Sequence, residues 1–162
     1  LKLLYSNPIQ HAATVQTYFA RTVKQHYEKE FQNARDAKIV LSERSPESIK
    51  VFVRALDQSG CLTDFAYDFL LEEYTNICRG IRKPDRLFYI NTPLYLCEER
   101  IKKRDRPGEH LCDLKYLRLL EANYFDYVRT FQLENSPKSV YISTKTNLGE
   151  LKRELVEFIN YS

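Results

Sequence analysis

The alternation of apolar and polar positions along the chain predicts helices that are separated by short strands. Apolar residues recur at helical spacing in six stretches, and three short runs rich in β-branched or aromatic residues fit strands buried in a sheet. We expect helices over 11–32, 46–59, 64–79, 94–103, 114–131 and 148–161, and strands over 38–42, 86–90 and 139–143. The pair Asn7-Pro8 is expected to end an earlier short element before the first helix.

This order of elements predicts an α/β fold in which helices cover both faces of a parallel sheet. Residues 1–162 are expected to form one domain, because 162 residues with 43% hydrophobic positions suffice for a single core. Ligands of such folds bind beyond the carboxyl ends of the strands. The residues that follow the three predicted strands are therefore candidates for a site: Glu43, Arg44 and Ser45; Asn91 and Thr92; and Thr144, Lys145 and Thr146.

Composition and charge exclude several classes of protein. No apolar run approaches the roughly 20 residues that a membrane-spanning helix needs, and we expect no membrane partner. The net charge of +3 is too small to indicate nucleic-acid binding, so none is expected. The four cysteines form no CxxC pair and the three histidines show no metal-ligand spacing, which favours reduced thiols in an intracellular protein over a zinc site.

Two polar groups of the sequence could handle a phosphate. Glu43 could act as a general base or hold a hydrated Mg²⁺, and Arg44 could clamp a phosphate. An ordinary surface pair next to a Ser-Pro helix start explains the same residues. Arg104 and Arg106 lie where a helix gives way to the loop at Pro107-Gly108, so the segment of about 102–113 could close as a lid over a polyphosphate. A solvated helix end is the alternative there.

Two further residues are candidates for binding a small molecule. Gln16 lies on a broadly apolar face of the first helix, where its amide could read the edge of a nucleobase or could simply be a satisfied core amide. Tyr5, before the Asn-Pro pair, could equally be part of the core in a chain with twelve tyrosines.

Motifs spread over nearly the whole chain resemble the deoxynucleoside kinases, the family with the mitochondrial thymidine kinase, the insect multisubstrate kinase and the deoxycytidine and deoxyguanosine kinases. The matching residues are Leu3-Leu4-Tyr5-x-x-Pro8, Gln16-Thr17-Tyr18, Glu43-Arg44-Ser45-x-x-Ser48 with Phe52, Ser59-Gly60, Pro84-Asp85-Arg86-Leu87-Phe88-Tyr89-Ile90, Thr92-Pro93, Arg100-Ile101-x-x-Arg104-x-Arg106-x-x-Glu109 and Leu114-Lys115-Tyr116-Leu117. The combination at these distances is far more specific than any one motif.

The resemblance implies transfer of a phosphoryl group from ATP to the 5′-hydroxyl of a deoxynucleoside, with Mg²⁺. The resemblance implies that Gln16 hydrogen-bonds the base and that Phe52 stacks on it. It also implies that Tyr5 and Glu109 hold the 3′-hydroxyl of the sugar. Catalytic roles fall to Arg44 beside the 5′-oxygen, Glu43 beside Mg²⁺, and Arg104 and Arg106 as lid arginines. Residues 144–148, with Thr144, Lys145 and Thr146, are expected near the adenine.

The same resemblance implies a homodimer through the helices at about 46–59 and 114–130, and a cytoplasmic or mitochondrial location, with a viral source left open. Family members that prefer purines or cytidine carry a charged pair at two places that hold Ser48-Ile49 and Val23 here. Loss of that pair favours thymidine or a broad range of pyrimidines, because an apolar pocket accommodates the thymine methyl group.

The sequence also departs from the family. Its phosphate-binding loop, Gly-x-x-Gly-x-Gly-Lys-Ser/Thr, and the Glu that acts as base are not among these residues; the chain begins at Leu1 and has no methionine. We therefore expect a P-loop kinase-like sheet that lacks its first strand through truncation. A degenerate, non-catalytic relative within a larger assembly is the alternative, and a nucleoside monophosphate kinase is a weaker one.

Overall fold

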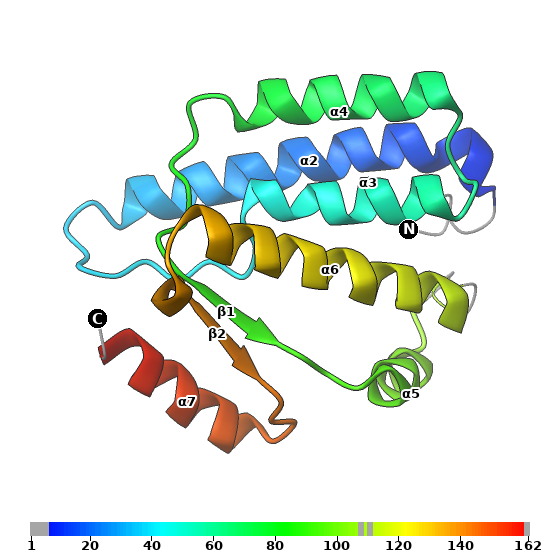
Figure 1. Cartoon of the computed structure of the whole chain (residues 1–162). Coiled ribbons are helices and arrows are strands. Elements are labelled where there is room, and N and C mark those ends of the chain that lie inside the picture. The colour runs from blue at the N-terminus through cyan, green and yellow to red at the C-terminus, as the bar shows by residue number, and fades with distance from the viewer. Residues whose placement is uncertain (1–6, 107–108, 110–111, 161–162) are drawn as a thin grey trace.

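A group of helices stacked against a small sheet makes up the computed structural model, which describes residues 7–106, 109 and 112–160 (Figure 1). The helices are α2 (Pro8–Asn33), α3 (Ile49–Gln58), α4 (Asp64–Cys78), α5 (Leu94–Arg104), α6 (Leu114–Glu134) and α7 (Leu148–Asn160), with short 3-10 turns η1 (Pro46–Ser48) and η3 (Pro137–Ser139), and the strands are β1 (Leu87–Ile90) and β2 (Val140–Ser143). The six helices of the described residues, and two of the three expected strands, were predicted within a few residues.

The two strands are parallel, with Leu87 beside Val140 and Ile90 beside Ser143. Successive side chains of a strand point to opposite faces of the sheet. Tyr89 accordingly stacks on Tyr124 of α6, while Phe88 contacts Phe158 of α7. Helices therefore cover both faces of a parallel sheet, which confirms the predicted α/β class.

The predicted strand over 38–42 is wrong. This segment has no regular secondary structure, and Ile39 and Leu41 expose 55% and 61% of their surface. A run of β-branched residues forms a strand only where a neighbouring strand supplies hydrogen-bond partners. Within the described part of the chain the segment has no such neighbour, since the sheet consists of β1 and β2.

Asn7 and Pro8 form the start of α2. Asn7 is the N-cap of α2 and accepts a hydrogen bond from the backbone N–H of Gln10 at 3.3 Å, and Pro8 is the first helical residue. Asparagine satisfies a backbone N–H that the first turn leaves free, and proline has no N–H to lose at that position. The pair therefore starts α2, and the earlier element predicted before it lies outside the described residues.

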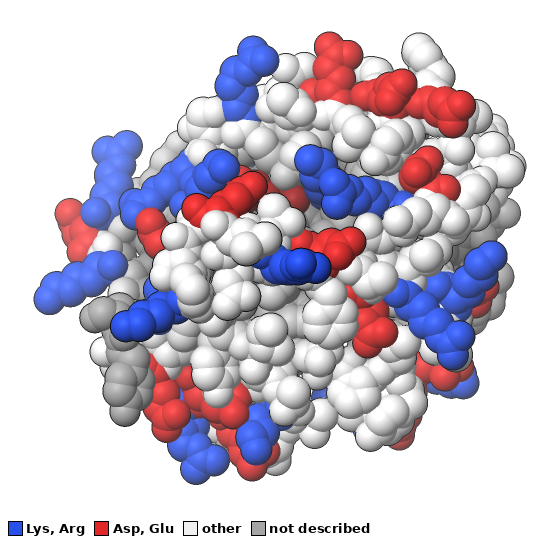
Figure 2. Space-filling model, in the orientation of Figure 1, with Lys and Arg blue, Asp and Glu red and all other residues white. Residues whose placement is uncertain are grey.

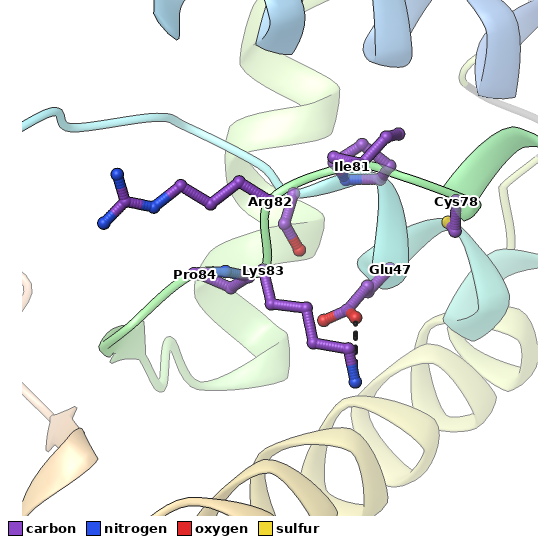
Figure 3. A pocket seen from close by; sticks show the side chains of 8 residues that line it. Glu47, Cys78, Ile81, Arg82, Lys83 and Pro84 are labelled. Carbon is purple, nitrogen blue, oxygen red and sulfur yellow. Dashed lines mark ion pairs between the residues drawn. The ribbon is translucent and has the colours of Figure 1, made fainter.

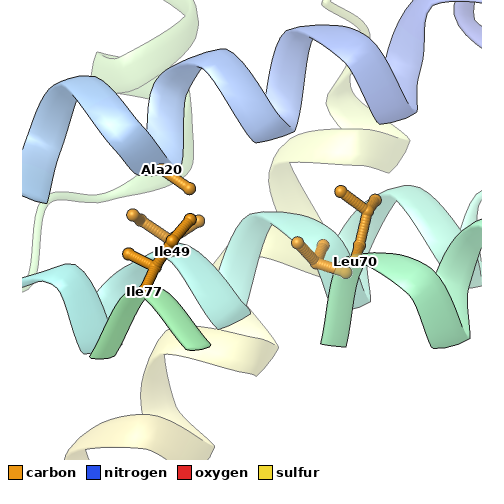
Figure 4. Packing of buried hydrophobic residues seen from close by; sticks show 5 residues of the cluster. Ala20, Ile49, Leu70 and Ile77 are labelled. Carbon is orange, nitrogen blue, oxygen red and sulfur yellow. The ribbon is translucent and has the colours of Figure 1, made fainter. Parts of the chain in front are cut away.

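The core of the helical layer lies between α2, α3 and α4. Ala20, Ile49, Leu70 and Ile77 meet there, together with Val53 (Figure 4). Among the ten residues of α3, only Gln58 is exposed, because α2, α4 and α6 surround this helix. The predicted dimer interface through residues 46–59 and 114–130 stays a prediction; within one chain, α3 packs against α6.

Charged side chains of both signs are interspersed on the face of the molecule in Figure 2, without a broad area of one sign. Among the described residues, no helix combines the length and apolarity that crossing a bilayer requires.

Candidate functional site

The loop that carries Glu43 and Arg44 runs between α2 and α3 and is fastened at its end. The Ser45 hydroxyl lies 3.2 Å from the hydroxyl of Tyr127 on α6. The Arg44 guanidinium lies over the Phe52 ring, 5.0 Å from its centroid. Both Glu43 and Arg44 are otherwise exposed to solvent. Two predicted site residues, Arg44 and Phe52, are therefore brought into direct contact.

Phe52 belongs to a column of aromatic rings that connects α3 to the sheet. Its ring meets the Tyr124 ring edge to face at 6.0 Å, and Tyr124 stacks on Tyr89 of β1 at 6.0 Å. Burial raises the pKa of Tyr124, and the nearby Arg44 charge acts in the opposite direction. Burial likewise raises the pKa of Tyr89 to about 12. Both phenols are therefore neutral at physiological pH. Tyr124 packs directly against Phe52, and Tyr89 supports Tyr124 from the sheet.

Gln16 is a buried polar side chain without a partner among the described residues. Only 5% of its surface is exposed, and Ala12 and Ala20, one turn away on either side, are buried as well. No hydrogen bond joins its amide to another described residue. Its polar atoms keep a narrow access to solvent, because every fully buried side-chain nitrogen or oxygen in the described residues has a hydrogen-bond partner. Such an amide is available for hydrogen bonds with a ligand.

One ion pair joins two described residues of the predicted lid, and Lys102 at its start pairs with Glu98 of α5. The Nε of Arg104 donates to a carboxylate oxygen of Glu109 at 2.9 Å, and the Glu109 side chain is 8% exposed against 47% for Arg104. α5 ends at Arg104, and the capping residue Asp105 has a left-handed φ of 45°. Arg106 is exposed, and its carbonyl accepts the backbone N–H of Glu109 at 3.0 Å. Arg104 and Glu109 are thus brought together, and Arg106 is free to face solvent.

The residues predicted near the adenine, Thr144, Lys145 and Thr146, form an exposed loop between β2 and α7. The start of this loop is held by Ser143, the last residue of β2. Ser143 Oγ accepts a hydrogen bond from the N–H of Lys145 at 3.1 Å and donates one to the carboxylate of Glu154 on α7. The side chains of the loop remain available to a ligand.

Some predicted site residues are not connected to the others. Tyr5 lies outside the described residues. Glu43 makes no ion pair with a described residue, and no group of three or more potential metal ligands occurs among the residues that the structure describes. Glu43 alone would offer Mg²⁺ one carboxylate, which fits an ion that is bound mainly through phosphate oxygens and water.

A small hollow lies on the other side of Ser45, between η1 and the loop that leads to β1 (Figure 3). Its lining is Ser45, Pro46, Glu47, Cys78, Ile81, Arg82, Lys83 and Pro84. Lys83 and Glu47 form an ion pair across it at 3.7 Å. Burial raises the pKa of the Cys78 thiol, so this cysteine is not an activated nucleophile. Of the candidates predicted from the sequence, Ser45 lines this hollow, whereas Gln16, Glu43, Arg44 and Phe52 do not.

Tyr124 and Tyr127 were missed from the sequence. Both lie on one face of the predicted helix 114–131, three residues apart, which is the signal that could have singled them out. Their contacts with Phe52 and Ser45 join segments that are distant along the chain.

Comparison with known proteins gives a consistent result. The family model described as deoxynucleoside kinase matches residues 1–160. The deoxyadenosine kinase of Dictyostelium discoideum is 26% identical over 129 residues, which are 80% of this chain and 51% of that protein. Human mitochondrial thymidine kinase 2 is 32% identical over 120 residues, 72% of this chain and 43% of that protein. The chain spans about half the length of these curated relatives.

Solved structures agree with the fold. Deoxyadenosine kinase from M. mycoides with bound dCTP has a TM-score of 0.79 and 16% identity, covering 98% of this chain and 78% of that one. The same enzyme with bound dATP has a TM-score of 0.76 and 15% identity, covering 98% and 79%. The predicted kinase-like α/β fold is confirmed.

Proposed function

Because the chain belongs to the deoxynucleoside kinase family, we propose that it binds a deoxynucleoside and phosphorylates the 5′-hydroxyl with ATP as donor. The observation that carries the proposal is Gln16, an amide that is 95% buried and yet has no hydrogen-bond partner among the described residues. Leaving a buried amide unpaired costs free energy, and a nucleobase edge would supply both the donor and the acceptor that the amide needs.

The remaining groups have complementary roles in the proposal. Phe52, which packs against Tyr124, stacks its ring on the base. Arg44, which lies over Phe52, places its positive charge beside the 5′-oxygen. Glu109, oriented by its ion pair with Arg104, accepts a hydrogen bond from the sugar 3′-hydroxyl. Exposed Arg106 stabilises the charge on the phosphoryl group in transit. Tyr5 joins Glu109 at the sugar.

ATP supplies the phosphoryl group, and Mg²⁺ offsets its charge. Glu43 would contribute one oxygen ligand, and Thr144, Lys145 and Thr146 would contact the adenine. The glycine-rich phosphate-binding motif is not within these 162 residues, so the proposed activity is that of the complete gene product. We also propose an intracellular location, in cytoplasm or mitochondrion, where nucleosides and ATP are available, and a homodimer through the helices at about 46–59 and 114–130, where Phe125 is exposed.

Thymidine, or a broad range of pyrimidines, is the proposed substrate. Val23 packs against the core between α2 and α4, and Ser48 is buried with its hydroxyl donating to the carbonyl of Ser45 at 2.8 Å. Neither position offers a charge to the exocyclic amine of a purine or cytosine, whereas an apolar wall accepts the thymine methyl group. The relatives are named for different bases, deoxyadenosine and thymidine, so the family alone does not decide the substrate.

The test has a binding arm and a turnover arm. Calorimetry with this chain and thymidine, deoxycytidine, deoxyadenosine, deoxyguanosine and thymidine monophosphate measures which of them binds. Chromatography of the products formed by the complete gene product with ATP and Mg²⁺ measures turnover. We expect pyrimidine deoxynucleosides to bind and to be phosphorylated fastest. Binding without turnover would support the non-catalytic alternative, preference for the monophosphate would identify a monophosphate kinase, and the absence of binding would refute the proposal.

A further inference from the structure

α6 makes a polar contact with the loop of Glu43 and Arg44. Ser45, at the end of this loop, and Tyr127, in the middle of α6, lie 82 positions apart in sequence, and their hydroxyl oxygens are 3.2 Å apart. Either hydroxyl can donate. Burial raises the pKa of Tyr127 to about 12, so the phenol keeps its proton at neutral pH.

The Ser45 hydroxyl is free for this contact because it does not cap the helix. Ser45 stands at the N-cap position before Pro46, but its side chain accepts no hydrogen bond from the first turn. The turn is closed in another way, by the N–H and hydroxyl of Ser48, which donate to the Ser45 carbonyl at 3.1 and 2.8 Å. A serine that usually stabilises a helix start is here directed across to another helix.

The loop itself has few other restraints. Residues 37–45 contain no helix or strand, and Glu43 and Arg44 are exposed. Ser42 donates its hydroxyl to the Arg44 carbonyl at 2.9 Å, which is a contact within the loop. Besides the turn that Ser48 closes on the Ser45 carbonyl, two side chains attach this end of the loop to the helices: the Ser45 hydroxyl at Tyr127 and the Arg44 guanidinium on Phe52.

We propose that Tyr127 is a positioning residue for Arg44, which it holds in place through the hydroxyl of Ser45. The inference rests on the proposed function, in which Arg44 faces the 5′-oxygen. A charge that stabilises a transition state acts only from the correct position, and a displacement of about 1 Å can cost roughly 100-fold in rate. Loosening the loop should therefore affect turnover more than nucleoside affinity, because Gln16 and Phe52, not Arg44, hold the base.

The experiment is a double-mutant cycle with Tyr127→Phe, Ser45→Ala and the double variant in the complete gene product. Both substitutions remove one hydroxyl and keep the packing. We expect each to lower kcat about 10-fold and to change KM for the nucleoside less than twofold, and the double variant to be no worse than either single variant, because both remove the same contact. Effects that multiply, or equal losses in KM, would overturn the proposal.

A matched control separates positioning from stability. Tyr27→Phe removes another buried tyrosine hydroxyl, which donates to the Arg82 carbonyl at 3.1 Å in the loop before β1. We expect it to lower the melting temperature by a similar amount and to leave kcat unchanged. If Tyr27→Phe lowers kcat as much as Tyr127→Phe does, the loss reflects general destabilisation and the proposal fails.

Limited proteolysis tests the contact independently of activity. Trypsin cleaves after Arg44, and cleavage requires a mobile backbone. We expect Tyr127→Phe and Ser45→Ala to speed cleavage at Arg44 several-fold at native temperature, and Tyr27→Phe to leave it unchanged. Faster cleavage in a protein that proves inactive would refute only the proposed function, whereas unchanged cleavage would refute the positioning role of Tyr127.

Discussion

Replacing Gln16 by leucine should make the free protein more stable and the nucleoside complex weaker. Leucine is close to glutamine in size and has no polar atoms to satisfy. Gln16 is 5% exposed and has no hydrogen-bond partner among the described residues, so the folded protein carries part of the cost of an unpaired amide. If Gln16 were instead a hydrogen-bonded structural amide, its replacement by leucine would lower the stability of the free protein.

The magnitude follows from burial. Leaving a buried polar group unpaired costs about 1–3 kcal/mol, and the lower end applies here because the amide keeps a narrow access to solvent. A gain of about 1 kcal/mol raises the melting temperature of a domain of this size by about 2–4 °C. A two-point hydrogen bond between an amide and a base is worth about 1–3 kcal/mol, so the nucleoside Kd should rise about 5- to 150-fold.

The assay combines thermal unfolding of the free protein with calorimetric titration of thymidine. The matched control is Gln25→Leu, which changes an exposed glutamine of the same helix and should move neither quantity. A lower melting temperature for Gln16→Leu, or an unchanged Kd, would show that Gln16 is a structural amide and that the base is read elsewhere.

Four further outcomes can be measured on the same protein. Arg106→Ala in the complete gene product should lower kcat about 1000-fold or more in steady-state kinetics and barely change nucleoside KM; unchanged turnover would remove this exposed arginine from the transition state. Glu109→Gln should weaken binding of thymidine but not of its 3′-deoxy analogue in calorimetry, and equal losses would place the sugar hydroxyl elsewhere. Val53→Ala, at a site 2% exposed, should lower the free energy of unfolding by about 2 kcal/mol in urea titration; a loss below about 0.5 kcal/mol would contradict the assigned core. Burial raises the pKa of Tyr127 and Tyr89 to about 12 from an ordinary value near 10, so the stability that neutral phenols provide is complete below pH 10 and should decline toward pH 12; a flat profile of unfolding free energy would refute this.

The helices could be predicted because the spacing of apolar residues within each segment already defines the buried face of the helix. Ile49, Val53 and Leu56 repeat at helical spacing, and all three are buried. The strand over 38–42 could not be predicted in the same way. Its residues have the right character, but a strand exists only beside another strand, and that condition is not local.

In the candidate site, too, contacts between residues near in sequence could be predicted, whereas contacts between distant segments could not. Arg104 and Glu109 are five residues apart, so their pairing follows from the end of one helix and a short loop. The contacts of Tyr124 with Phe52 and of Tyr127 with Ser45 depend on how α6 crosses α3. The spacing of Tyr124 and Tyr127 puts them on one face of their helix, but nothing local in the sequence indicates that this face meets Phe52 and Ser45.

The enclosure of α3 by three other helices has a consequence for how the molecule opens. Amide protons exchange slowly where many packed neighbours must separate first, and α3 is in that position. β1 and β2 pair only four residues each from distant parts of the chain, and α7 rests on β2. The amide protons of β2 and α7 should therefore exchange much faster than those of α3. Helix α3, which carries Phe52, would then stay folded in molecules whose loop at Thr144, Lys145 and Thr146 has already unfolded.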